Sequence, residues 1–385
     1  MNRRSCDKVI VVSVIILIVI GLISVYSATS VLPSVKAKFS DKGSMIYLKK
    51  QIFTLFLGII LMLILMFLPE EKLKKITLPL LILSFILLIL VFTPLGVSAG
   101  GAKRWIRIPP NVFQPSELAK LAMVFFLAWF LSKANYKKDS IRDFLIPISV
   151  MGVFQAIFIK QPDFGAFLTI GILTFTILFI RGTNLKYLFV TLLLCLPIVY
   201  YLAKEPYRWR RILSFIDPWA DPQGSGFQLV QSLIALGSGG LIGQGLGEGK
   251  QKLAFLPEIH TDFIFAHIGE EMGFVGAVAV VSLFLIISIR GLNIAMRQSD
   301  EFKSLLATGV TLLISFQALI NFAVVTGLAP TKGLPLPFIS YGGSSLLVNL
   351  MAVGVLLNLS RQKDSIFLRE SEIDKPKRVY RYWRK

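Results

Sequence analysis

The run Val9-Ile-Val-Val-Ser-Val-Ile-Ile-Leu-Ile-Val-Ile-Gly-Leu-Ile23 decides the fold class. A helix built from this run would be apolar on every side, and the segment from Leu78 to Phe92 has the same character. Apolar blocks of about 17 to 25 residues are long enough to cross a bilayer as helices. The sequence therefore predicts an all-α polytopic membrane protein.

Ten such blocks predict ten membrane-spanning helices, at about 9–28, 52–68, 76–93, 117–131, 144–160, 164–180, 185–202, 263–289, 304–326 and 339–360. Arg3, Arg4 and Lys8 precede the first block, which lacks a cleavage site and is expected to remain as an anchor. An even number of spans places both termini in the cytoplasm, in agreement with the positive-inside rule. Residues 1–361 are expected to form one transmembrane domain and residues 362–385 a basic cytoplasmic tail.

The composition is 55% hydrophobic and 16% charged, with a formal net charge of +19. Cytoplasmic loops account for part of this excess, and no soluble domain carries basic residues for nucleic acid, which is not an expected partner. The predicted outer side is also basic, with Lys36, Lys38, Lys42, Lys49, Lys50, Lys103, Arg104, Arg107, Lys160, Lys204, Arg208, Arg210, Arg211, Lys250, Lys252 and Lys332. The positive-inside rule favours such residues on the cytoplasmic side, so their number on the outer side predicts an anionic ligand there.

The outer loop between spans seven and eight is unusually long, from 203 to 262. Loops of this length are usually functional or disordered. Apolar residues at 229, 230, 233, 234 and 236 predict an interfacial amphipathic helix over 227–236, and seven glycines follow between 237 and 249. We therefore expect an ordered, functional loop.

Both histidines and four carboxylates fall in the sixteen residues from Leu256 to Glu271, at the start of span eight. Such a polar cluster at the mouth of a membrane helix is typical of a site. The alternative is structural, because Thr261 or Asp262 could simply cap the helix that follows.

Four further outward-facing segments are candidates. The segment 100–107 is a basic stretch around Trp105, explained equally well by an interfacial tryptophan. Glu117 and Lys120 open span four, and an ionisable group inside a span favours function. The segment 160–163 with Asp163 suits either a tight turn or a site. The segment 330–345 is rich in proline and glycine, which predicts a broken backbone at membrane depth or close helix packing.

The motifs of soluble enzymes are absent from the sequence, including a phosphate-binding glycine loop and a His-Glu-x-x-His zinc helix. His260-x-Asp262 is too short a match to predict a tightly held zinc ion. Cys6 and Cys195 have no plausible mutual partner, so we expect no disulfide framework.

Four long motifs resemble the shape, elongation, division and sporulation family of membrane proteins: 210–226, 231–240, 256–265 and 336–345. The resemblance covers about Val9 to Arg361. Within the family, Asp217-Pro-Trp-Ala-Asp221 and Thr331-Lys-Gly333 favour the cell-division branch over the elongation branch.

The resemblance implies a ten-span peptidoglycan glycosyltransferase that polymerises lipid II. It also implies a class B penicillin-binding transpeptidase and other division proteins as partners, and a location in the bacterial cell membrane at the division septum. By the same resemblance Asp262 is the catalytic base, a loosely bound Mg²⁺ or Mn²⁺ is the cofactor with Asp262 as its candidate ligand, and Trp105, Asp163 and Lys332 face a central cavity.

The implied reaction is an inverting attack by the 4-hydroxyl of a lipid II sugar on a glycan linked to polyprenyl diphosphate. Its leaving group needs positive charge, for which Lys103, Arg210, Arg211, Lys250, Lys252 and Lys332 are candidates. Arg104, Lys120, His260 and Ser344 complete the expected substrate-binding residues.

Two questions stay open at this level. A carboxylate at a helix amino terminus is a weak base, so either bound diphosphate strengthens Asp262 or Asp262 mainly holds the metal. A lipid II transporter, an elongation-type polymerase and a scaffold for the transpeptidase are the alternative functions.

Overall fold

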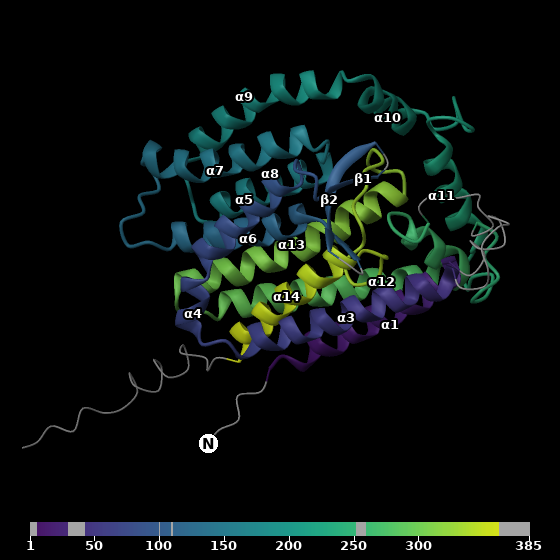
Figure 1. Ribbon diagram of the computed structural model, residues 1–385, viewed down its shortest axis with the longest axis horizontal. Coiled ribbons are helices and arrows are strands. Elements are labelled where there is room, and N and C mark those ends of the chain that lie inside the picture. Colours follow the sequence, from purple (N-terminus) through teal and green to yellow (C-terminus); the bar gives the residue numbers. More distant parts are fainter. Residues whose placement is uncertain (1–5, 30–42, 100, 109–110, 252–258, 362–385) are drawn as a thin grey trace, which may run out of the picture.

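A computed structural model describes residues 6–29, 43–99, 101–108, 111–251 and 259–361. Each of the ten expected spans coincides with a helix (Figure 1). These helices are α1 (Lys8–Thr29), α3 (Gly43–Phe67), α5 (Thr77–Leu90), α6 (Pro115–Leu131), α7 (Ile141–Lys160), α8 (Phe164–Ile180), α9 (Leu185–Ala203), α12 (Ile264–Met296), α13 (Glu301–Val325) and α14 (Gly343–Ser360). The short helix α4 (Glu70–Lys75) leads into α5.

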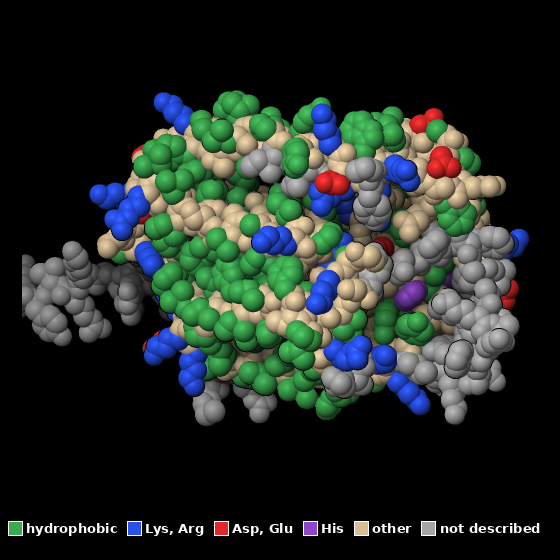
Figure 2. All heavy atoms as spheres, turned by 45° about the horizontal axis from the view of Figure 1, so that its top comes forward, with side chains coloured by type: hydrophobic (Ala, Val, Ile, Leu, Met, Phe, Trp, Pro, Cys, Tyr) green, Lys and Arg blue, Asp and Glu red, His purple; other side chains and the backbone are tan. Residues whose placement is uncertain are grey.

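Seven helical stretches in the described residues are long and apolar enough to cross a membrane, one of them running through α4 and α5. The helices α8 and α9 are apolar but shorter by this measure. Figure 2 shows hydrophobic side chains covering a broad band of the surface, with Lys and Arg towards its edges. The predicted polytopic helical fold is confirmed.

The centre of the bundle is formed by α6, α13 and α14. Every residue of α6 is buried except Trp129. Small residues permit close approach, as at Gly354 of α14, where an added Cβ would lie 2.4 Å from the carbonyl oxygen of Met62 in α3. Such close contacts between helix backbones are typical of packing in membranes.

A small sheet lies between α5 and α6, where the sequence predicted only an interfacial stretch. It consists of β1 (Gly96–Ala99), β2 (Ala102–Ile108) and β3 (Asn111–Phe113), which pair antiparallel in that order. Trp105 of β2 stands opposite Val97 of β1. The sheet thereby holds the basic segment around Trp105 in a fixed extended conformation.

The long connection between α9 and α12 is ordered where it is described. It contains α10 (Pro206–Ile216) and α11 (Phe227–Ser238), so the predicted helix is present. Its buried face differs from the predicted one, because Ser232 is buried and Ile234 is exposed. The glycines after α11 lie against α12: an added Cβ on Gly239 would meet the Gly269 carbonyl oxygen at 1.9 Å. Close backbone contact therefore explains this glycine.

The same contact breaks α12 at Gly273, where φ is 67°. The backbone N–H groups of Phe274 and Val275 donate to the carbonyl oxygens of Gly240 and Leu241, at 2.9 and 3.1 Å. In return, the N–H of Gln244 donates to the Glu270 carbonyl oxygen at 3.0 Å. The backbone groups that lack helical partners at the break in α12 thus form hydrogen bonds with the glycine-rich segment after α11. Backbone polar groups within a membrane need such partners inside the protein.

Both described chain ends lie at the same end of the bundle. The Asp7 backbone N–H donates to the Ser360 hydroxyl at 3.1 Å, and Arg290 pairs with the Asp7 carboxylate at 3.0 Å. An even number of spans, as predicted, requires both ends of the chain to lie on the same side of the membrane.

Replacement Gly273→Ala is predicted to lower the stability of the fold by about 2 kcal/mol or more. A side chain there would adopt a positive φ, and its Cβ would lie 2.3 Å from the Gly243 nitrogen. Thermal unfolding in detergent measures the effect. Gly237→Ala is the control, since this glycine of α11 has no atom within 4 Å of the added Cβ. Equal melting temperatures for the two variants would contradict the role given to Gly273.

Candidate functional site

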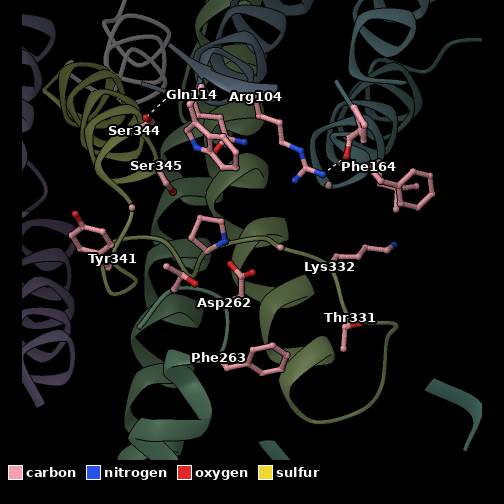
Figure 3. Close-up of a pocket in the computed structure, with 18 of the residues that line it drawn as sticks. Arg104, Gln114, Phe164, Asp262, Phe263, Thr331, Lys332, Tyr341, Ser344 and Ser345 are labelled. Atoms are coloured by element: carbon pink, nitrogen blue, oxygen red, sulfur yellow. Dashed lines mark hydrogen bonds between the residues drawn. The ribbon is translucent and has the colours of Figure 1, made fainter. Parts of the chain in front are cut away.

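A cavity of about 1070 Å³ opens at the end of the bundle opposite the described termini. Its lining comes mainly from α3, β2, β3, α8, α9, α10, the turn before α12, the loop between α13 and α14, and the start of α14. Figure 3 shows Asp262 between Tyr341 and Ser345 on one side and Lys332 on the other. Segments far apart in the sequence therefore meet around one carboxylate.

Asp262 lies in the turn that precedes α12. Its side chain is partly buried and lines the cavity. An added Cβ on Gly333 would lie 3.1 Å from Asp262 Oδ2, so the loop after α13 passes directly beside the carboxylate. The residue at the N-cap position of α12 is Phe263, whose side chain makes no capping hydrogen bond.

The turn before α12 and the loop after α13 are joined by hydrogen bonds. Asn321 of α13 donates from Nδ2 to the carbonyl oxygens of Asp262 and Leu334, each at 2.8 Å. The Ser340 hydroxyl donates to the Thr261 carbonyl oxygen at 2.5 Å, and the Tyr341 N–H donates to that of His260 at 2.8 Å. These contacts fix Asp262 relative to Lys332.

The charged side chains that line the cavity are mostly cationic. Five are positive and two are negative: Lys50, Arg104, Arg208, Arg211 and Lys332 against Glu205 and Asp262. Charges of one sign in a cleft with apolar walls concentrate ligands of the opposite sign. The lining therefore suits a ligand with more than one negative charge.

Lys332 lies in a partly buried position beside an aromatic ring. Burial lowers the pKa of its ammonium group from 10.5 to about 8. Its Nζ lies 5.3 Å from the centre of the Phe164 ring, and Arg208 lies over the same ring at 5.4 Å. The loop that carries Lys332 is held by Arg211, which donates to the Thr331 carbonyl oxygen at 3.0 Å.

Six of the residues expected from the sequence do line the cavity: Asp262, Arg104, Trp105, Arg211, Lys332 and Ser344. Arg104 donates from Nε to the Gln161 carbonyl oxygen at 3.3 Å and also to that of Pro162. The Ser344 hydroxyl accepts from the Gln114 N–H at 2.7 Å. The structure thus brings together residues from four of the five candidate segments.

Asp163 and Lys120 are buried outside the cavity lining. Asp163 caps α8 by accepting from the Ala166 N–H at 3.1 Å, and it accepts from the Ser116 hydroxyl at 2.7 Å. Lys120 pairs with Glu117 at 2.8 Å, both almost fully buried. Gln317 donates to the same Glu117 carboxylate at 3.3 Å. In this structure the two residues support the helices behind the cavity.

The other expected residues also lie outside the lining. Lys103 Nζ donates to the Thr93 carbonyl oxygen at 2.8 Å, and the His260 ring packs against those of Tyr47 and Tyr341. Arg210 and Lys250 are exposed, and Lys252 falls outside the described residues. The second histidine, His267, is buried in α12, 3.5 Å from the Glu271 carboxylate.

Several lining residues were not predicted, and Arg208 is the most instructive. The helix α10 places Arg208 and Arg211 on one face, because residues three apart are neighbours on a helix. Arg210 consequently faces elsewhere. The sequence counted Lys50 and Arg208 among the outer cations without selecting either as a site residue, and the spacing within α10 would have selected Arg208 in place of Arg210. Gln51 and Gln114 carried no comparable signal.

A tightly held metal ion does not fit the described residues, in which no group of three His, Cys, Asp or Glu side chains could hold one. Asp262 and Glu205 are the carboxylates of the lining. Mg²⁺ in enzymes that act on phosphates is commonly held by one or two carboxylates together with the substrate phosphates and water. The donor set therefore fits an ion that arrives with an anionic substrate.

Comparison with known proteins adds a decisive observation. Residues 7–365 match the family of cell cycle proteins that comprises FtsW, RodA and SpoVE. The chain belongs to this family. It is 46% identical to a probable peptidoglycan glycosyltransferase FtsW of Geobacter sp. (strain M18), over 92% of this chain and 96% of that protein. It is 41% identical to stage V sporulation protein E of Bacillus subtilis, over 94% of this chain and 98% of that protein.

Solved structures of similar chains share the fold. A chain from a peptidoglycan synthase complex that coordinates polymerization and crosslinking aligns with a TM-score of 0.74 and 31% identity, over 93% of this chain and 98% of that one. The rod shape determining protein RodA of Thermus thermophilus aligns with a TM-score of 0.68 and 28% identity, over 93% of this chain and 97% of that one.

Replacement Asn321→Leu is predicted to loosen the two loops that carry Asp262 and Lys332. It removes two hydrogen bonds and leaves buried carbonyl oxygens unpaired, at about 1 to 3 kcal/mol for each group. Hydrogen exchange measured by mass spectrometry should rise over 259–263 and 331–342.

Asn358→Leu is the matched control, because Asn358 also donates to backbone carbonyl oxygens, those of Leu65, Met66 and Leu68, at the opposite end of the bundle. Its exchange should rise near those residues and stay unchanged over 331–342. Unchanged exchange at 331–342 in Asn321→Leu would contradict the proposed link.

Proposed function

We propose that this protein is a peptidoglycan glycosyltransferase that polymerises lipid II into glycan strands during cell division. The observation that carries the proposal is the position of Asp262, a carboxylate beside a group of cations in a cavity at the end of a membrane bundle. This arrangement suits a substrate with a lipid anchor, a diphosphate and a sugar. The names of the FtsW relatives support the same reaction.

The chemistry follows from these groups. Asp262 accepts the proton of the sugar 4-hydroxyl as the hydroxyl oxygen forms a bond to the anomeric carbon of the growing glycan. The bond from that carbon to the diphosphate oxygen breaks, and the leaving diphosphate keeps the electron pair. Attack from the face opposite the leaving group inverts the anomeric configuration. The proton on Asp262 then passes to water.

The leaving diphosphate gains negative charge in the transition state, so cations fixed in advance lower the barrier. Arg104, Arg208, Arg211 and Lys332 line the cavity and are available for this role. A divalent ion, Mg²⁺ or Mn²⁺, held by Asp262 and the substrate oxygens would supply further charge stabilisation. Held in this way, the ion would be lost when the diphosphate leaves.

A lipid II transporter is supported less well. Transporters bind their substrates near the membrane midplane, at discontinuous helices. The cavity here is lined by residues from helix ends and loops, such as Lys50, Glu205 and Gly343. The intramembrane pair Glu117 and Lys120, which suggested transport, is outside this lining and compensated in charge.

The proposal includes partners and location. The relative in a peptidoglycan synthase complex supports assembly with a class B penicillin-binding transpeptidase, which would crosslink the strands made here. The higher identity to FtsW proteins than to RodA favours the division septum, with other division proteins as partners. Both termini are proposed to be cytoplasmic, so that the cavity opens on the outer side.

Replacement Asp262→Asn is predicted to lower lipid II polymerisation at least about a thousandfold, since the amide cannot accept the proton. The measurement is glycan formation in liposomes by the purified protein with its cognate transpeptidase. Asp139→Asn is the control for loss of a carboxylate, because Asp139 lies between α6 and α7, away from the cavity.

Substantial chain formation by folded Asp262→Asn protein would refute the role of Asp262. Chelator added to the wild type tests the divalent ion. Loss of activity that Mg²⁺ or Mn²⁺ restores would support the ion, and full activity in chelator would contradict it.

The catalytic efficiency kcat/KM is predicted to fall above pH 8. Lys332 has its pKa lowered to about 8, so its ammonium group loses its charge as the pH rises through that value. Because kcat/KM reports the free enzyme, the fall should follow this pKa. In Lys332→Arg the charge persists, and the fall at pH 8 should disappear. The same alkaline limb in both proteins would exclude Lys332 as its cause.

A further inference from the structure

Gln51 is distinguished from the other polar side chains of the cavity. It belongs to α3, lines the cavity and is 3% exposed. Its Oε1 is buried without a hydrogen-bond partner among the described residues, and no other lining residue there has such a side-chain atom. Thr54 and Ser344, its neighbours in the lining, both accept hydrogen bonds from the protein.

The orientation of the Gln51 amide is fixed by Ser340. Nε2 of Gln51 donates to the Ser340 carbonyl oxygen at 3.5 Å, and a carbonyl oxygen can only accept. The amide nitrogen must therefore face Ser340, which leaves Oε1 on the other side of the amide plane. A buried acceptor without a partner is uncommon in folded proteins and calls for an explanation.

The same residue connects Gln51 to the proposed base. The Ser340 hydroxyl donates to the carbonyl oxygen of Thr261, the residue before Asp262. Gln51 and Asp262 are thus connected through Ser340 and line one cavity.

The charged and the uncharged polar side chains of the lining come mostly from different elements. Four of the five cations come from β2, α10 and the loop after α13: Arg104, Arg208, Arg211 and Lys332. The contributions of α3, β3 and the start of α14 are mainly uncharged, with amides and hydroxyls from Gln51, Thr54, Asn111, Ser344 and Ser345, and Lys50 of α3 is the one cation among these described lining residues. Asp262 lies between the two sides in Figure 3, which labels Lys332 on one and Ser345 on the other.

We propose that Oε1 of Gln51 accepts a hydrogen bond from an N–H or O–H group of the acceptor sugar, the lipid II sugar whose 4-hydroxyl attacks. The acceptor sugar then lies along α3 and α14, and the diphosphate of the growing glycan lies along the cations. This assignment rests on the proposed polymerase function. It makes Gln51 a specificity-determining residue for one of the two substrates.

The chemistry of the acceptor suits this position. An N-acetylated sugar carries several hydroxyl groups and an acetamido N–H, all donors without charge. A site that contains a buried acceptor discriminates against ligands that leave it unpaired. The cations, in contrast, would contribute little to a neutral sugar and much to a diphosphate.

The test separates the two substrates. A 4-deoxy lipid II lacks the attacking hydroxyl and can serve only as donor. A lipid II analogue with carbon in place of the anomeric oxygen has no leaving group and can serve only as acceptor. Single coupling of the two by the protein with its transpeptidase gives a separate KM for each. Gln51→Met is predicted to raise the acceptor KM about tenfold, with the donor KM and kcat nearly unchanged.

Gln51→Glu distinguishes substrate contact from a structural role. Its carboxylate keeps an acceptor but cannot donate to the Ser340 carbonyl oxygen. If Gln51 binds the sugar, Gln51→Glu should keep an acceptor KM closer to wild type than Gln51→Met does. If the bond to Ser340 were the important one, Gln51→Glu would be impaired at least as strongly, and the proposal would be overturned.

The remaining outcomes are also decisive. Equal changes in both KM values, or none, would overturn the assignment of Gln51 even though the wild type couples the analogues. Failure of folded, partner-bound wild type to couple them would overturn the proposed function itself. If Gln51→Met does not fold, the comparison of Gln51→Glu with wild type decides: a tenfold rise in acceptor KM alone contradicts the proposal, and retention supports it.

Discussion

The hydrogen bonds that join the turn before α12 to the loop between α13 and α14 are the constraint on which the site depends. A loop at the end of a membrane bundle is stable only if its backbone polar groups find partners within the protein. Asn321 and Ser340 supply them, by donating to the carbonyl oxygens of Asp262, Leu334 and Thr261. The same bonds hold the proposed base beside Gly333 and Lys332. Loop stability and catalytic geometry therefore have one physical origin.

The long connection between α9 and α12 serves the site from the other side. Its glycine segment pairs with the backbone of α12 around Gly273 and so supports the turn that carries Asp262. Its helix α10 presents Arg208 and Arg211 to the cavity, and Arg211 also holds the loop of Lys332. Positive charge is thus placed by a helix and a hydrogen bond before any ligand arrives, the arrangement in which charge stabilises a transition state most effectively.

Much of this structure could be predicted from the sequence, and there are physical reasons why some elements and residues could not. Apolar length located ten helices of the bundle, because a helix that crosses a bilayer needs an apolar stretch of about 20 residues. Motif resemblance found Asp262, Lys332 and Trp105. Spacing within an unrecognised helix hid Arg208 as a site residue. The three strands of the sheet follow one another directly along the chain but are too short to give a clear periodic pattern. Packing of α3 against segments distant in sequence hid Gln51. Asp163 and Lys120 carry the expected charge, but capping of α8 and pairing with Glu117 engage them behind the cavity. Local patterns identify such residues without revealing which partner they face.

In the proposed mechanism the cavity holds a diphosphate-linked glycan and an acceptor sugar on either side of Asp262. An experimental structure of Asp262→Asn with its transpeptidase and lipid II bound would test this arrangement. We expect a diphosphate against Arg208, Arg211 and Lys332, and a sugar 4-hydroxyl within about 3 Å of the side chain at position 262. A lipid II headgroup bound near the membrane midplane, or outside this cavity, would contradict it.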